Sequence, residues 1–302
     1  MQRRSFLRNT GLTLAGLALF NKESLAFFLD DPAWKITMLT DDIGIFTEKG
    51  GTIAFLLTKK GMVVVDSQFP DSAGHLIEEL KKKNSKPFRY LINTHHHGDH
   101  TNGNVAFKGL AEHVIAHENS KTNQLRVATE QKTPVEKFYL PDMTFGDAGW
   151  KTKVGKEKIR AHYFGAGHTN GDAMIHFEHA NIVHMGDLVF NRRHPYIDKT
   201  AGADIANWIK LLDKAISTFD NSTRFVCGHA GTGYDVLIKA DDLKAFGNYL
   251  GNVLKFTESE IRAGKTKEEI LKAKEIPGSP EWKGDGIERP LTAAFIELSA
   301  NK

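Results

Sequence analysis

The chain has 302 residues, of which 40% are hydrophobic and 25% are charged, an ordinary globular composition that fits one large domain or two small ones. It contains no low-complexity tract and no repeat at solenoid or propeller periods. The formal net charge is +3, and residues 1–26 carry all of it. Residues 27–302 are therefore formally neutral, without a basic stripe in the sequence, which argues against nucleic acid as a partner.

The first 26 residues have the pattern of a signal peptide. Basic residues precede the apolar run Gly11–Phe20, and the small residues Ser24 and Ala26 follow it. The pair Arg3–Arg4 resembles the twin-arginine export signal. An uncleaved anchor helix is the alternative, but so short an apolar run, at ~1.5 Å per residue, cannot cross ~30 Å of hydrocarbon. We expect cleavage after Ala26 and a periplasmic or secreted mature protein with no stable membrane anchor.

From residue 43 onward, short apolar runs alternate with helical stripes. Periodicity predicts, in chain order, strands at Ile43–Phe46 and Thr52–Leu57 joined as a hairpin, a strand at Met62–Val65, a helix at Asp71–Lys83, and strands at Phe88–Ile92, His113–Ala116, Lys158–Tyr163, Ala173–Phe177, Ile182–His184 and Arg224–Cys227. Helices are predicted at Ile205–Phe219, Asp241–Ala263 and Lys267–Lys274, with a loop at Pro277–Pro290. Strands that alternate with amphipathic helices indicate a layered α/β fold, and without a Pro/Gly-rich linker we interpret residues 27–302 as one domain.

The stretch NTHHHGDHTNGN follows a predicted strand and holds four histidines and one aspartate within six positions. In extended backbone alternate residues share a face, so His95 and His97 can point the same way while His96 points away. Asp99 and His100 follow a glycine that permits a sharp turn. Imidazole nitrogens and carboxylate oxygens are good ligands for zinc, so the stretch predicts half of a metal site.

Three further positions can complete such a site. His168 lies in the loop sequence GAGHTNGD, Asp187 follows the apolar run that begins at Ile182, and His229 follows the run Phe225–Gly228. Each is expected at a strand end, where a sheet holds loop residues in position. The alternatives are a solvated or adventitious His-rich loop, a turn or N-cap role for Asp187, and a phosphate-cradling loop around His229, which lacks the lysine of a P-loop.

These residues, taken in chain order, resemble the ligand set of the metallo-β-lactamase superfamily of hydrolases. The resemblance covers nearly all of residues 35–235 and implies an αββα sandwich of the α/β class, with the metals along one sheet edge. It implies two zinc ions, although iron or manganese stays open. The implied ligands are His95, His97 and His168 for the first zinc, Asp99, His100 and His229 for the second, and Asp187 as the bridge between them.

Residues around the ligands have expected roles too; that of Asp66 is implied by the resemblance, and those of the others follow from their places in the sequence. Asp66, at the end of an early strand, would orient the metal loop by hydrogen bonds, and His96 would pack beside the ligands or support them without binding metal. His184 is expected to be a strand residue near the site. Cys227, the only cysteine, is expected to be a buried small residue, and a chain with one cysteine has no internal disulfide.

The expected activity is hydrolysis of a small-molecule carboxylic derivative: an ester, lactone, thioester or β-lactam. A hydroxide held between the two metal ions would attack the carbonyl carbon, and Asp99 would accept a hydrogen bond from it and pass a proton on. The alternatives are a β-lactamase proper and, in another class, an iron-dependent oxidoreductase of the same fold.

The substrate is indicated less directly than the reaction. Zinc β-lactamases with Cys in place of Asp187 often have Lys three residues later, and lactonases have Tyr there, whereas this chain has Phe190. Phe190, Arg192 and Arg193 are candidate substrate contacts, because they follow the bridging ligand. An arginine there can hold an anionic group, and a solvated loop is the alternative.

Overall fold

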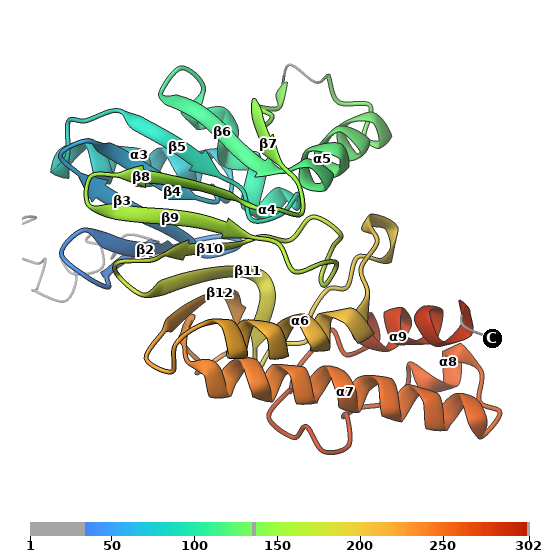
Figure 1. Cartoon of the computed structure of the whole chain (residues 1–302). Helices are drawn as coiled ribbons and strands as arrows, with labels where there is room; N and C mark the ends of the chain where they lie inside the picture. The colour runs from blue at the N-terminus through green and yellow to red at the C-terminus, as the bar shows by residue number, and fades with distance from the viewer. Residues whose placement is uncertain (1–33, 135–136, 301–302) are drawn as a thin grey trace, which may run out of the picture. The chain divides into compact units, whose positions relative to one another are not determined.

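The computed structural model describes residues 34–134 and 137–300, and the expected signal peptide, residues 1–26, lies outside them. Residues Ile36–Lys302 form one compact unit. Two β-sheets make up its centre, with helices on the outer sides (Figure 1). Within the described part of the chain, no helix combines the length and the apolar character that a membrane span requires.

The first sheet has seven strands in the order β1-β2-β3-β4-β5-β6-β7. Their bounds are β1 Lys35–Met38, β2 Ile43–Thr47, β3 Ile53–Thr58, β4 Gly61–Val65, β5 Phe88–Ile92, β6 Ala111–His117 and β7 Met143–Phe145. β2, β3 and β4 pair antiparallel, whereas β4 to β7 pair parallel. The carboxyl ends of β4 and β5 therefore lie side by side, and Asp66 and His95 follow them at the same sheet edge.

The second sheet has six strands in the order β13-β12-β11-β10-β9-β8. Their bounds are β8 Trp150–Val154, β9 Glu157–His162, β10 Met174–Phe177, β11 Ile182–Asn191, β12 Arg224–Ala230 and β13 Leu237–Ile238. β11 and β12 pair parallel, and the pairing is irregular between His184 and Phe190. The bulged part of β11 carries Asp187, and the paired end of β12 carries His229.

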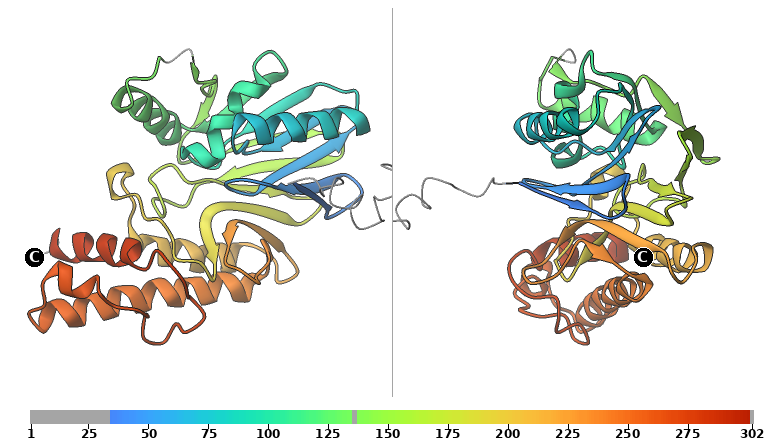
Figure 2. Two further views of the ribbon diagram at one scale, coloured as in Figure 1. Left: turned by 180° about the vertical axis from the view of Figure 1, so that it is seen from behind. Right: turned by 90° about the vertical axis from the view of Figure 1, so that its left-hand side faces the viewer.

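Helices cover both outer faces, so the layers run helix, sheet, sheet, helix (Figure 2). Their bounds are α3 Pro70–Lys83, α4 Gly98–Thr101, α5 Glu118–Glu130, α6 Ile205–Thr218, α7 Ala240–Arg262, α8 Lys267–Ile270 and α9 Glu288–Ala300, with 3-10 turns η1 Asn102–Phe107 and η3 Lys199–Ala201. The expected αββα sandwich is confirmed.

Two apolar cores hold these layers together. Between the sheets, Ile45 and Val63 of the first sheet belong to one buried cluster with Ile159 of the second. On the outer side of the second sheet, Trp208 of α6 and Phe246 of α7 belong to a second cluster. All five side chains are at most 4% exposed, and burial of such side chains contributes ~1.5–3 kcal/mol each. The metal-ligand candidates thus lie in strands of packed sheets or in the segments that follow such strands.

Several elements differ from the sequence prediction. α5 was not predicted, because its buried positions include the polar residues Ser120, Asn123 and Gln124 and no apolar stripe marks it. α9 begins inside the predicted loop Pro277–Pro290, since proline is tolerated in the first turn of a helix. β11 and β12 also continue through Asp187 and His229, which were expected after their strands.

Candidate metal centre

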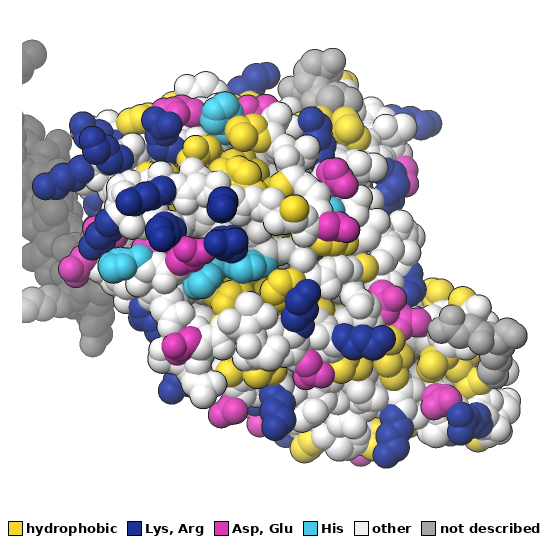
Figure 3. Space-filling view, in the orientation of Figure 1, with side chains coloured by type: hydrophobic (Ala, Val, Ile, Leu, Met, Phe, Trp, Pro, Cys, Tyr) yellow, Lys and Arg dark blue, Asp and Glu magenta, His cyan; other side chains and the backbone are white. Residues whose placement is uncertain are grey.

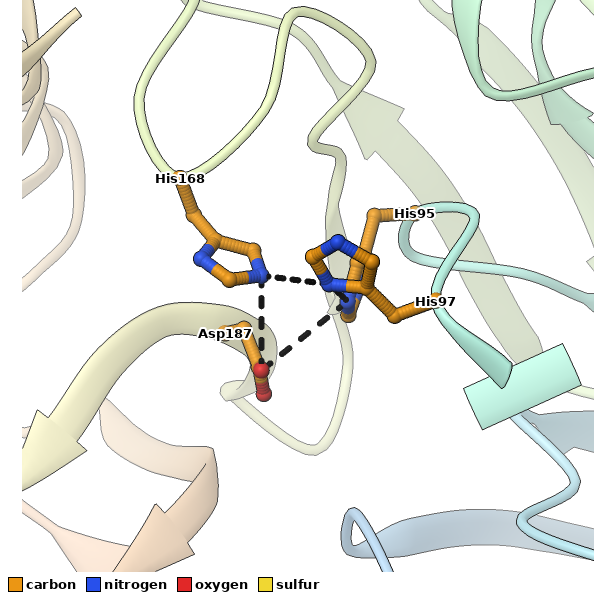
Figure 4. Close-up of side chains that lie close together, drawn as sticks. All are labelled: His95, His97, His168 and Asp187. Atoms are coloured by element: carbon orange, nitrogen blue, oxygen red, sulfur yellow. Dashed lines mark hydrogen bonds and ion pairs between the residues drawn. The ribbon is translucent and has the colours of Figure 1, made fainter. Parts of the chain in front are cut away.

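Four side chains converge where the two sheets meet. His95 and His97 come from the loop after β5, His168 from the loop after β9, and Asp187 from β11 (Figure 4). Nδ1 of His97 lies 3.1 Å from Nε2 of His95 and 2.8 Å from Nε2 of His168. Oδ2 of Asp187 lies 3.5 Å from Nε2 of His168 and 3.9 Å from Nε2 of His95. Three ring nitrogens and one carboxylate oxygen form a donor set suited to a tetrahedral zinc site.

A second group of side chains shares Asp187 with the first. It consists of Asp99 and His100 from α4 and His229 from β12. Nε2 of His229 lies 3.1 Å from Oδ2 of Asp99 and 3.5 Å from Nε2 of His100. Oδ1 of Asp187 lies 3.0 Å from Nε2 of His100 and 3.4 Å from Nε2 of His229. Asp187 therefore turns one carboxylate oxygen toward each group.

The surroundings of Oδ1 of Asp187 show whether the two groups can accommodate a cation. The atom is buried and no described residue donates a hydrogen bond to it, although Nε2 of His100 is only 3.0 Å away. A buried carboxylate oxygen without a hydrogen bond is costly unless a positive charge compensates it. The residues present therefore fit metal ions at both groups.

Three glycines shape the surroundings of the ligand candidates: one bends a strand, and two leave room for side chains. Gly186 has φ +52°, a conformation that favours glycine, and it lies in the irregular pairing that redirects β11 before Asp187. A Cβ at Gly228 would lie 2.0 Å from Oδ1 of Asp187. A Cβ at Gly51 would lie 2.1 Å from the ring of His100. Any larger residue at Gly228 or Gly51 must displace a ligand candidate.

The rings of two ligand candidates are held through their second nitrogen. Nδ1 of His100 lies 2.7 Å from Oδ2 of Asp66, which also accepts a hydrogen bond from the hydroxyl of Thr94 at 2.8 Å. Nδ1 of His168 lies 2.8 Å from the backbone oxygen of Tyr196. Such contacts fix the tautomer and the ring orientation of a metal-binding histidine. The structure thus places Asp66 beside the metal loop, where its orienting role was expected.

Asp198 is a supporting residue that the sequence analysis missed. Its Oδ2 lies 3.0 Å from Nε2 of His97 and 3.5 Å from Nε2 of His96, while its Oδ1 accepts hydrogen bonds from the backbone of Thr200 and Ala201. Both ring nitrogens of His96 are buried without a hydrogen bond among the described residues. His96 therefore points toward Asp198 and not into the first group. The only sequence signal for Asp198 was an N-cap-like pattern, which indicates a turn.

Burial and neighbouring charges shift the histidine pKa values in opposite directions in the two groups. Burial lowers the pKa of His95 well below its ordinary value and that of His168 to about 3, so both rings are neutral with free lone pairs. Burial acts in the same direction at His229, but the charge of Asp187 and the carboxylate of Asp99 raise the pKa of His229 to about 9. A cation at the second group would take the place of that proton, so binding there should release protons.

Comparison with known proteins identifies the family. Residues 47–229 match the family model described as the metallo-beta-lactamase superfamily. The chain belongs to this superfamily. A protein named metallo-beta-lactamase type 2 from Elizabethkingia meningoseptica is 23% identical over 238 residues, which are 76% of this chain and 89% of the relative.

Two further similarities agree with this membership. A hydroxyacylglutathione hydrolase from Pelagibacter ubique (strain HTCC1062) is 25% identical over 59% of this chain and 66% of the relative. The solved structure of a metallo-beta-lactamase from Pontibacter korlensis has a TM-score of 0.61 and 20% identity, and covers 72% of this chain and 99% of that chain. The metallo-β-lactamase superfamily match contains all seven ligand candidates and ends at the last of them, His229.

A cavity of about 670 Å³ lies beside this site, and its lining includes Ala230, the residue that directly follows His229. Part of its lining comes from the residues after β11 and from the end of β12 with the loop that follows. The rest comes from a segment at residues 280–285, outside the family match. The lining residues are Arg192, Arg193, Ala230, Gly231, Thr232, Tyr234, Pro280, Glu281, Lys283, Gly284 and Asp285. The volume is that of a small-molecule site.

The three candidate substrate contacts take different positions. Phe190 is 4% exposed and its ring stacks on that of His229, with centroids 5.4 Å apart, so it supports a ligand from behind. Arg192 is held by an ion pair with Asp242 at 2.6 Å. Arg193 is exposed, lines the cavity, and forms no ion pair with the described residues. Arg193 is therefore the candidate whose charge is free for a substrate.

His184 and Cys227 are buried residues of the neighbouring strands, as expected. Nε2 of His184 lies 2.9 Å from the backbone oxygen of Thr52, and its Nδ1 accepts a hydrogen bond from the backbone of Gly186, so its ring supports the bulge before Asp187. Burial raises the pKa of the Cys227 thiol to about 12. The thiol stays protonated and is unsuited to act as a nucleophile.

Proposed function

We propose that this chain is a hydrolase with two adjacent metal ions, which are zinc, and that it cleaves an ester, lactone, thioester or β-lactam. The observation that carries the proposal is the position of Asp187, whose two carboxylate oxygens face two separate groups of ligand candidates. Two relatives with hydrolase names support the class of reaction. The histidine and carboxylate donors suit zinc, although iron and manganese accept similar donors.

The chemistry divides between the ions and the chain. Two bound cations acidify a water molecule and polarise a substrate carbonyl. Asp99 has a side chain 32% exposed, whereas that of Asp187 is 5% exposed, so Asp99 is the carboxylate that substrate and water can reach. It accepts the proton that the attacking water loses and returns it to the leaving group. No serine or cysteine nucleophile is required.

Metal analysis and a turnover screen test this proposal together. The purified protein should contain two equivalents of zinc by elemental analysis and should hydrolyse at least one class in a panel of esters, lactones, thioesters and β-lactams. A chelator should abolish turnover, and added zinc should restore it. His168→Ala should lose mainly the first metal and His229→Ala mainly the second. Two equivalents of iron with no hydrolysis would contradict the proposal and favour the oxidoreductase alternative.

The position of Arg193 favours a substrate that carries an anionic group near the scissile bond. Its free guanidinium lines the cavity that begins beside His229, and a guanidinium binds carboxylates in a fixed geometry. Arg193→Ala should therefore raise KM for a carboxylate-bearing substrate by about 10-fold and leave its neutral ester unchanged. Lys244→Ala, which removes an exposed cation from α7, is the control. An equal effect on both substrates would contradict this role.

Export through a twin-arginine signal is a further part of the proposal. It rests on the sequence of residues 1–26, and that export route carries folded proteins, so the metals can be bound beforehand. Arg3→Lys with Arg4→Lys should retain the protein in the cytoplasm, as fractionation and immunoblotting would show. Unchanged recovery in the periplasm or medium would refute the twin-arginine assignment.

A further inference from the structure

The β8–β9 hairpin carries a concentrated group of cations on the outer face of the second sheet. Lys151 and Lys153 of β8 and Lys158 and Arg160 of β9 are all exposed, and we call them the hairpin patch. Figure 3 shows Lys and Arg side chains gathered over these two strands. Lys151 pairs directly opposite Arg160, and Lys153 directly opposite Lys158. Two cross-strand pairs on the same face of the hairpin therefore bring like charges together.

Protection of a sheet edge explains only part of this arrangement. β8 is an edge strand, and lysines on an edge strand prevent pairing with other chains. β9 lies between β8 and β10, so its cations Lys158 and Arg160 need another reason. Like charges directly opposite each other destabilise a strand pair. The β8–β9 hairpin contains two such like-charge pairs, which indicates that these cations bind a partner.

The charges of the hairpin patch are largely uncompensated. Arg160 forms an ion pair with Glu178 at 2.7 Å. In residues 34–134 and 137–300, no carboxylate comes within ion-pair distance of Lys151, Lys153 or Lys158. The formal neutrality of residues 27–302 therefore hides a local positive excess, and the absence of a basic stripe in the sequence does not extend to the folded surface.

Two cavities beside the hairpin extend the cationic surface into a track. One, of about 300 Å³, is lined by the hairpin patch together with Thr152, Ile159 and Glu178. The other, of about 330 Å³, shares Lys153 and reaches Lys60, Arg89 and Tyr90 at the first sheet. Of these two cations, Arg89 forms an ion pair with Glu112 at 3.0 Å. A row of cations along two adjoining hollows suits a chain with repeated anionic groups better than a single small ion.

We propose that this track binds an acidic polysaccharide, through its carboxylate or sulfate groups. Single-stranded nucleic acid and membrane are disfavoured, because single-stranded bases need exposed rings to stack on and a membrane surface takes inserted apolar side chains. Tyr90, the only aromatic residue in the two linings, is half-buried, with its ring stacked on that of His113 and in edge contact with that of Trp150. The large exposed apolar side chains among the described residues lie outside both cavities. They are Met38, Leu125, Met143, Tyr196, Tyr234 and Ile296.

Binding of the full chain to immobilised heparin, an acidic polysaccharide, tests the proposal. The test variant combines Lys151→Gln, Lys153→Gln and Lys158→Gln. The control combines Lys81→Gln, Lys82→Gln and Lys83→Gln, which removes the same charge from exposed lysines in the last turn of α3. We expect the test variant to bind at least ~10-fold more weakly and the control less than ~2-fold, with the difference shrinking as salt rises.

Three results would overturn the proposal. These are an equal loss in both variants, no heparin binding by the natural chain at low salt, and tighter binding to single-stranded DNA or to anionic lipid vesicles at equal concentration of anionic groups. Circular dichroism and metal content should match in all variants. If the triple variant is misfolded, Lys153→Gln alone decides, because Lys153 lines both cavities, and its binding should then fall by at least ~2-fold.

Discussion

At the scale of single residues, the metal centre depends on places where only a hydrogen atom fits. Gly228 of β12 faces the carboxylate of Asp187, and a Cβ there would lie 2.0 Å from Oδ1. The same oxygen is the one turned toward His100 and His229. The backbone of β12 thus sets the position of the proposed bridge as directly as the side chain does.

Gly228→Ala should therefore displace Asp187 and empty the second group of its metal. Turnover should fall by at least ~10²-fold, by the general scale of losing a preorganised charge, while the fold persists. Gly74→Ala is the matched control: beyond the backbone of its own helix α3, no atom lies within 4 Å of its Cβ position, so it should keep both metals and gain ~0.5–1 kcal/mol of stability. A Gly228→Ala protein with two metals and normal turnover would show that Asp187 tolerates the methyl group.

Asp198 offers a second test at a single residue, because its charge acts on the ligand His97 from the opposite side of the ring. Asp198→Asn keeps the size and can still accept the backbone hydrogen bonds of the following turn, so it isolates the charge. The affinity of the first group for zinc should fall by ~10–100-fold, measured by competition with a chelator. An unchanged affinity would assign Asp198 to the turn alone.

The convergence of the ligand candidates was predictable from the sequence, whereas the residues that support them were not. His95 and His97 follow the two-residue alternation of extended backbone, and their order with His168, Asp187 and His229 carries the family resemblance. Asp198 contacts the same rings but lies in no motif, and its partners depend on how the turn before η3 meets the loop after β5. That contact exists only in the folded chain.

At the scale of elements, the positions of the longer buried strands were predictable, whereas strand ends and the strands β1, β7, β8 and β13 were not. β5 agrees with its prediction because a β-branched and aromatic run ends at a polar loop. β11 continues ten residues through Asp187 because every one of them is buried, and Gly186 bends the strand without ending it. α5 was missed because it buries polar side chains that find hydrogen bonds only in the folded chain, such as that of Asn123 with Asn170.

The packing of β9 and β10 on the end of α6 predicts sensitivity to acid. The rings of His162 and His176 lie with centroids 5.3 Å and 5.1 Å from that of Phe219. Burial, and then the neighbouring His176, lowers the pKa of His162 from 6.5 to about 4. The unfolded chain thus binds a proton between pH 6.5 and 4 that the folded chain does not, so stability is lost as pH falls through this window.

His162→Phe should reduce that loss. In metal-free protein, Tm should fall between pH 7 and pH 5 by ~2–4 °C less for His162→Phe than for the natural chain. Comparison of the two metal-free proteins cancels the contribution of the other histidines. His179→Phe, at an exposed position, should leave the fall unchanged. Identical slopes for all three proteins would mean that His162 titrates alike in the folded and unfolded chain.

At the scale of the whole molecule, the candidate metal centre joins the two sheets. One set of ligand candidates follows β5 of the first sheet, and the other set comes from β11, β12 and the loop after β9 of the second sheet. No single segment can form either group, so the site assembles only when the sheets have packed. Metal binding should therefore stabilise the sandwich as a unit.

Asp187 is the residue on which the account depends most, and the metal content of Asp187→Asn is its most direct test. The substitution keeps the size but removes the negative charge that offsets two dications, so their repulsion should expel one metal. We predict about one equivalent of metal by elemental analysis, turnover reduced by at least ~10²-fold, and an unchanged fold by circular dichroism. Two equivalents of metal with normal turnover would contradict the bridging role.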